Sequence, residues 1–145
     1  MENKSPKITA ASIIITVIVF ICVIAMFVYG EQEPAVTAAD GQMKISGMYG
    51  TDFPVSGIKA VSLIDRAMDD IAPDMTRTNG YGGFGSTLKG NFSADTLGDF
   101  MLFTDSKASP TILIERKEGK NIYISFPDGA KTKALYEELK SLAQE

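Results

Sequence analysis

The chain has 145 residues, a length typical of one domain, and its formal net charge is −4 at pH 7. It contains no histidine, which excludes the commonest general base and the commonest zinc ligand. Its single cysteine, Cys22, lies in an apolar stretch near the N-terminus, so the rest of the chain has neither a disulfide nor a thiol nucleophile.

An uncharged stretch covers residues 8–30. At about 1.5 Å of rise per residue, a helix of this length reaches roughly 35 Å and can cross a hydrocarbon core of about 30 Å. We therefore expect a transmembrane helix over residues 8–30, with the lipid bilayer as its partner. The competing interpretation is a signal peptide cleaved before Ala39, because Val36 and Ala38 have the small side chains that a peptidase site requires.

The charges that flank this stretch predict its orientation. Lys4 and Lys7 precede it, whereas Glu31 and Glu33 follow it. Positive flanks stay in the cytoplasm. We expect residues 1–7 to form a short cytoplasmic N-terminus, and the C-terminal domain of this single-pass cell-membrane protein to be extracytoplasmic.

The chain after the apolar stretch divides into a linker and a mainly β domain. Residues 31–41 are polar, contain Pro34 and lack a periodic apolar pattern, so we interpret them as a juxtamembrane linker. Residues 42–145 carry short apolar runs separated by turn residues, a pattern typical of β structure. The expected strands are 42–48, 58–65, 75–79, 86–93, 99–105, 111–115 and 121–126.

The last part of the domain gives the clearest local signals. Residues 117–120 join the last two expected strands as a hairpin through Gly119. After Pro127 and the capping candidate Asp128, the apolar period changes to that of a helix. We expect this amphipathic helix to cover an open end of the strands. Its apolar positions are Ala130, Ala134, Leu135, Leu139 and Leu142.

Several different short motifs are distributed along these expected elements. They are Tyr49-Gly50, Ile58, Pro73, Arg77-Thr78-Asn79-Gly80, Gly90-Asn91-Phe92, Ile122-Tyr123-Ile124, Thr132 and Leu135-Tyr136. Their pattern resembles a bacterial pleckstrin-homology-like domain family that is often found behind a transmembrane anchor. The resemblance implies a seven-stranded barrel or sandwich with a C-terminal helix. It implies a membrane association and no catalytic residues.

A glycine-rich segment, residues 79–90, lies between two expected strands. A phosphate-binding loop would be followed by a helix, whereas a β run follows here, so we interpret the segment as a flexible or bulged connection. Tyr81 and Phe84 either form an exposed contact patch or fold back over the core. Asn79 is a further candidate contact for a ligand or partner.

Arg77 lies just before the glycine-rich segment and has two interpretations. Its guanidinium either binds a carboxylate ligand or forms a structural ion pair with a nearby aspartate. The candidate partners for that ion pair are Asp65, Asp69, Asp70 and Asp74.

The charged residues exclude several classes of function. After residue 30 the chain carries 17 Asp and Glu against 12 Lys and Arg, a net of −5, which argues against a nucleic-acid partner. The spacing of Asp69, Asp70 and Asp74 does not match a calcium-binding loop, so no metal or other cofactor is expected. Lys89 near Ser86 matches no serine-lysine arrangement, and we expect no enzyme activity.

We therefore expect a membrane-anchored, non-catalytic interaction module that binds a protein or peptide. Its expected partner is another membrane or envelope protein. The alternative is a membrane-bound sensor of a small ligand or lipid, with Arg77 and the glycine-rich segment as its pocket. A polar pocket beside Arg77 would favour the sensor, and an exposed strand edge would favour the interaction module.

Overall fold

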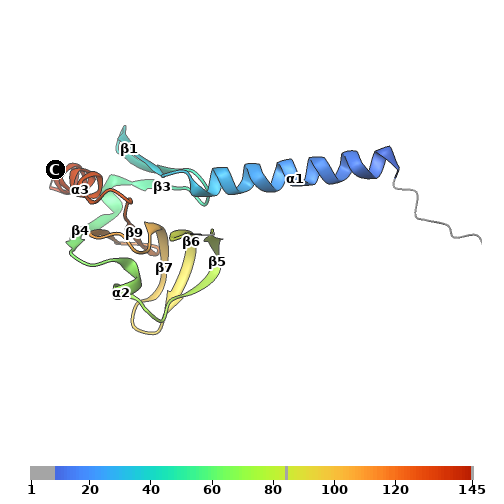
Figure 1. The fold of residues 1–145 in the computed structure, drawn as a ribbon. Coiled ribbons are helices and arrows are strands. Elements are labelled where there is room, and N and C mark those ends of the chain that lie inside the picture. Colours follow the sequence, from blue (N-terminus) through green and yellow to red (C-terminus); the bar gives the residue numbers. More distant parts are fainter. Residues whose placement is uncertain (1–8, 84, 145) are drawn as a thin grey trace, which may run out of the picture.

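The computed structural model describes residues 9–83 and 85–144. Its first element is helix α1 (Ala10–Glu31), which projects from a β body formed by the described residues that follow it (Figure 1). Thr9 caps α1, because its side chain accepts a hydrogen bond from the Ser12 backbone N–H at 3.3 Å. In the described part of the chain, α1 is the one helix long and apolar enough to cross a membrane, a property that signal sequences share. Lys4 and Lys7 lie outside the described residues.

A small antiparallel sheet of order β1-β2-β3 follows α1 directly. The linker interpretation of residues 31–41 is wrong, because this segment contains the last residue of α1 and all of β1. Asp40 and Gly41, with φ angles of 54° and 73°, form the two-residue turn that β-hairpins prefer, and this turn pairs β1 with β2. The strands are β1 (Ala35–Ala39), β2 (Gln42–Ser46) and β3 (Thr51–Pro54).

A six-stranded sheet of order β4-β8-β9-β7-β6-β5 forms the second layer. Its neighbouring strands are antiparallel, except that β7 and β9 are parallel. The antiparallel β8–β9 pair confirms the hairpin predicted at residues 117–120. The strands are β4 (Ile58–Ile64), β5 (Thr76–Gly82), β6 (Thr87–Ala94), β7 (Gly98–Asp105), β8 (Thr111–Arg116) and β9 (Asn121–Ile124).

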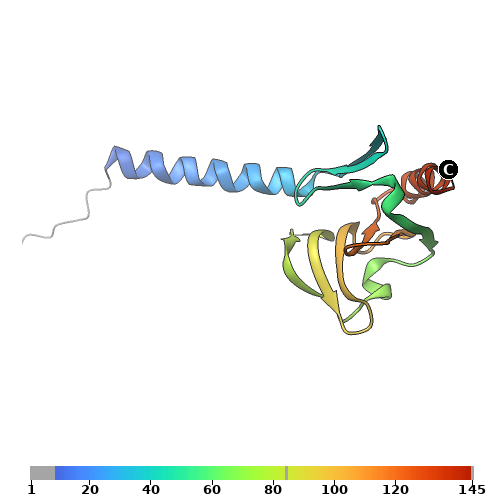
Figure 2. The same cartoon turned by 180° about the vertical axis from the view of Figure 1, so that it is seen from behind.

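The predicted C-terminal helix is present as α3 (Gly129–Ala143), with Asp128 as its cap. The Asp128 carboxylate accepts a hydrogen bond from the Ala130 backbone N–H at 2.9 Å. The helix packs against the edge strand β4, and it lies at the end of the β body remote from α1 (Figure 2). Two short helical segments were not predicted, namely η1 (Val55–Gly57) and α2 (Met68–Ile71).

The two sheets and α3 share a hydrophobic core. Its main cluster joins side chains of β2 and β3 to those of β4, β7, β8, β9 and α3. A second cluster lies beneath α2 on the other side of the large sheet. The chain is therefore mainly β, between an N-terminal apolar helix and a C-terminal helix. The main cluster contains Met43, Ile45, Phe53, Ile58, Phe103, Ile112, Ile114, Ile122, Ile124, Phe126 and Leu139.

Candidate functional site

The C-terminal end of α1 is bound to the β body by polar side chains. Glu31, the last residue of the helix, accepts a hydrogen bond from the Tyr81 hydroxyl at 2.8 Å through one carboxylate oxygen. Its other oxygen accepts a hydrogen bond from the Thr87 hydroxyl, also at 2.8 Å. Tyr81 belongs to β5 and Thr87 to β6, so the helix end is attached to two adjacent strands. We call Glu31, Gln32, Tyr81, Thr87 and Lys89 the junction.

Lys89 is the most deeply buried member of the junction, with 1% of its surface exposed. Its ammonium group donates a hydrogen bond to the backbone carbonyl of Gln32, the residue that caps the C-terminus of α1. A cation at this position also interacts favourably with the helix dipole. Burial lowers the pKa of Lys89, while the negative charge of Glu31 acts in the opposite direction.

Close packing adds to these polar contacts. A Cβ atom on Gly30 would lie 2.5 Å from ring atoms of Tyr81, so only glycine lets the helix approach this ring. The Phe27 and Tyr81 ring centroids lie 6.4 Å apart, at an interplanar angle of 65°. Tyr81 is therefore packed against α1, so it forms neither an exposed patch nor a cover over the core clusters of the β body.

The environment of Tyr81 predicts that its contribution to the stability of the fold depends on pH. Burial, and then the hydrogen bond to Glu31, raise the pKa of Tyr81 to about 12. Because folding favours the neutral phenol, this contribution to stability is complete below pH 10 and is lost as the pH rises toward 12. We expect an alkaline titration of phenolate absorbance to show a late step that Tyr81→Phe lacks.

The titration has an internal reference, because burial also raises the pKa of Tyr123. The chain has five tyrosines, and two of them should lose their phenol proton at unusually high pH. Tyr81→Phe should remove one of these two high-pH steps and leave the step of Tyr123. A Tyr81→Phe curve that loses only an early, ordinary phenol would show that Tyr81 is not packed against Glu31.

A small cavity lies beside the junction. It is lined by residues that include Glu31, Lys89 and Thr104, and its volume is about 30 Å³. The Thr104 hydroxyl is buried and has no hydrogen-bond partner among the described residues. This volume is on the scale of one water molecule. The cavity is therefore too small for a metabolite or a lipid headgroup.

Two other predicted contact residues, Arg77 and Asn79, lie together on one strand. Arg77 and Asn79 are exposed on β5, an edge strand whose pairing with β6 shifts register between these two residues. The Asn79 backbone carbonyl accepts a hydrogen bond from the Asn91 side chain at 3.4 Å. Phe84 lies outside the described residues. The structure thus brings Tyr81 to the junction and leaves Arg77 and Asn79 on an open strand edge.

The structural ion pair expected for Arg77 is absent from the described residues, where the one ion pair joins Lys131 to Glu33. Asp74, one of its candidate partners, instead accepts a hydrogen bond from the Asp95 backbone N–H at 2.9 Å. Within residues 9–83 and 85–144, no group of three acidic or cysteine side chains is placed to hold a metal ion.

No family model, no characterised protein and no solved structure matches this chain.

A groove of about 500 Å³ runs between β1 and α3, and we call it the edge groove. On the helix side, its residues lie at positions i, i+3, i+4 and i+7, which form one face of α3. On the strand side, consecutive residues line the groove. Because their side chains point to opposite faces of the sheet, the surface that they share is the edge of β1. It is lined by Glu33, Pro34, Ala35, Val36, Phe126, Lys131, Ala134, Leu135 and Glu138.

Charged groups border the edge groove. The Lys131 ammonium pairs with the Glu33 carboxylate and lies 4.4 Å from the centroid of the Phe126 ring. Glu138 contributes a second carboxylate. This groove was not predicted from the sequence, because residues 31–41 were interpreted as a linker. The Asp40-Gly41 turn was the signal that could have revealed the strand.

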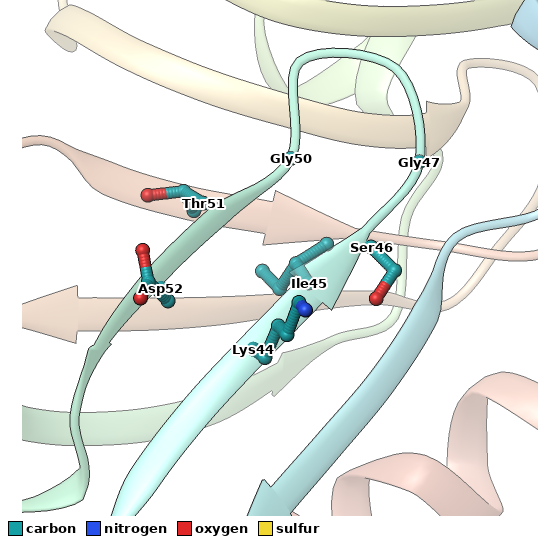
Figure 3. A pocket seen from close by; sticks show the side chains of 7 residues that line it. All are labelled: Lys44, Ile45, Ser46, Gly47, Gly50, Thr51 and Asp52. Atoms are coloured by element: carbon teal, nitrogen blue, oxygen red, sulfur yellow. The ribbon is translucent and has the colours of Figure 1, made fainter.

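A second open pocket, of about 490 Å³, lies at the β2–β3 loop. Lys44 and Asp52 occupy directly opposite positions on the two strands, while Ile45 lies on the other face of β2 (Figure 3). The rest of its wall is formed by Ser46, Gly47, Gly50 and Thr51. The pocket offers few apolar side chains, so it lacks the lining typical of a small-molecule site.

Proposed function

We propose that this chain is a membrane-anchored, non-catalytic interaction module that binds an extended segment of a protein partner. The apolar helix α1 would be the anchor. The flanking charges support a cytoplasmic N-terminus and an extracytoplasmic β body. The partner would then be another membrane or envelope protein.

A pleckstrin-homology-like assignment of the β body is part of this proposal. It is supported by the motifs in residues 49–142, some of which meet in space. Gly80 pairs with Gly90 in adjacent strands, and the Tyr49 ring packs against Gly90. The parallel β7–β9 pair is a feature that the resemblance did not imply.

The observation that carries the proposal is the edge groove beside an unpaired strand edge. Within residues 9–83 and 85–144, β1 pairs only with β2, and no strand lies along its other edge. Such an edge presents free backbone N–H and C=O groups, to which an extended peptide can add as a further strand. The face of α3 would form the opposite wall, and Leu135 and Val36 would supply apolar contacts for alternate side chains of the peptide.

The β1–β2 register identifies the backbone groups available for strand addition. Ala39 pairs with Gln42 across the two-residue turn, and such a turn closes on a hydrogen-bonded pair. Bonded and non-bonded pairs alternate along an antiparallel ladder. Val36 and Ala38 therefore direct their backbone groups toward the open edge.

Crosslinking in native membranes tests this site. A photo-crosslinking amino acid at Ala134, which lines the groove, should capture a partner segment. The same amino acid at Ala143, exposed on α3 outside the groove, serves as the matched control. Ala38→Pro removes an outward N–H and should abolish the crosslink, whereas Ala38→Ser keeps that N–H and the crosslink.

Mass spectrometry of the crosslinked product identifies the partner segment, and thermal unfolding checks that both Ala38 variants are folded. Equal capture from positions 134 and 143 would contradict a specific groove. A crosslink that survives in a folded Ala38→Pro variant would contradict binding by strand addition.

A further inference from the structure

We propose that the β body rests on the bilayer surface, with the β2–β3 loop around Tyr49 in the headgroup layer of neutral lipid. This inference rests on the proposed anchoring by α1 and adds a second surface to it. It replaces the expected picture of a domain held away from the membrane by a linker.

The level of the membrane follows from α1. Its 22 residues give a length of about 33 Å, slightly more than a hydrocarbon core of about 30 Å. If α1 spans the bilayer, Phe27, one turn before Glu31, lies at the boundary between hydrocarbon and headgroups. The Tyr81 ring contacts Phe27 and Gly30, so the adjacent ends of β5 and β6 lie within the headgroup layer.

Tyr49 belongs to the same end of the molecule. A Cβ atom on Gly90 would lie 3.0 Å from the Tyr49 ring, and Gly90 follows Lys89, whose ammonium is bonded to the end of α1. The loop between β2 and β3 lies next to the end of α1 in both views (Figures 1 and 2). The loop thus flanks the point at which the chain leaves the bilayer.

The segments at this end of the β body have a composition that favours contact with lipid. Residues 45–51 and 78–88 contain no charged side chain, although the part of the chain after α1 is rich in charge. Among the described residues after α1, the large apolar side chains classed as exposed are Tyr49, at 36%, and Leu97, at 38%. Leu97 lies in the β6–β7 turn, at the other end of β6.

The nature of the contact also follows from charge. The net charge of −5 after residue 30 disfavours attraction to anionic lipids. Tyrosine is enriched at membrane interfaces because its ring is apolar and its hydroxyl is polar. The contact is therefore aromatic and insensitive to salt.

Tryptophan fluorescence in the full-length chain tests the proposal, because the chain contains no tryptophan. Three single variants, Tyr49→Trp, Leu97→Trp and Phe20→Trp, are reconstituted into phosphatidylcholine vesicles. The vesicles contain brominated lipids that quench either near the headgroups or deep in the acyl chains. Phe20 lies in the middle of α1 and reports on anchoring. Met48→Trp is a second probe of the loop if Tyr49→Trp does not fold.

We expect the shallow quencher to remove most of the Tyr49→Trp emission, which should also be shifted to shorter wavelength than that of Leu97→Trp. The Leu97→Trp emission should be unaffected, and Phe20→Trp should be quenched by the deep label. High salt and added anionic lipid should not increase the quenching of the Tyr49→Trp emission by the shallow label.

Each contrary outcome has a distinct meaning. If both loop probes behave like Leu97→Trp while Phe20→Trp is quenched, the anchor stands and surface docking is wrong. If Phe20→Trp is not quenched, the anchor itself is wrong and surface docking falls with it. If loop quenching requires anionic lipid, the proposed neutral, aromatic contact is wrong.

Discussion

Replacing Leu139 with alanine is expected to lower the free energy of unfolding by about 2 to 5 kcal/mol. This side chain is 1% exposed and projects from α3 into the main core cluster. Its loss would create a cavity at the contact between the helix and the two sheets. The effect is large relative to a total stability of about 5 to 15 kcal/mol for a domain of this size.

Chemical denaturation of the full chain in detergent, followed by circular dichroism, measures this effect. Leu135→Ala should cost less than Leu139→Ala, because Leu135 is only half-buried and lines the edge groove. Glu138→Ala, on the exposed surface of α3, should change stability by no more than about 0.5 kcal/mol. Equal and small effects of all three substitutions would mean that α3 is not part of the core.

Replacing Lys89 with alanine should release α1 from the β body and lower the free energy of unfolding by about 2 to 5 kcal/mol. The substitution removes a fully buried side chain and leaves the Gln32 carbonyl without its donor. Cleavage by a glutamyl endopeptidase, which cuts after glutamate, measures the release of α1. Its potential cleavage sites are Glu31 and Glu33, which flank Gln32. Both glutamates are held in the native chain, the first by Tyr81 and the second by Lys131.

Lys107→Ala is the matched control, because Lys107 is an exposed lysine that is not a member of the junction. It should leave both stability and cleavage unchanged. Cleavage after Glu31 at the same rate in native protein, Lys89→Ala and Lys107→Ala would show that the junction is open and that Lys89 does not fix α1.

The sequence predicted those parts of the fold that depend on local pattern. The alternation in Ile112-Leu113-Ile114 and the Gly119 turn identified the β8–β9 hairpin, and the spacing of Leu135 and Leu139 identified α3. β1 was missed because Ala35–Ala39 is made of small residues with a weak apolar signal. Strand β3 is only four residues long, which is too short to establish a period.

The candidate sites depend on contacts between distant segments, which local pattern does not contain. Lys89 was considered only as a base for Ser86, whereas its partner Gln32 lies 57 residues away in sequence. Tyr81 and Glu31 are 50 residues apart. The edge groove likewise joins the first strand to the last helix. Arg77 and Asn79 were predicted from their neighbours in sequence, and the structure places both, exposed, on the edge strand β5.

In a membrane-spanning chain, as proposed, the attachment at the junction would couple the orientation of the β body to the thickness of the bilayer. A helix longer than the local hydrocarbon thickness tilts, and a thicker membrane reduces that tilt. Since Glu31, Tyr81 and Lys89 fix the end of α1 to β5 and β6, the β body must turn with the helix. If α1 spans the bilayer as proposed, the open edge of β1 therefore changes its angle to the membrane plane with the thickness of that bilayer.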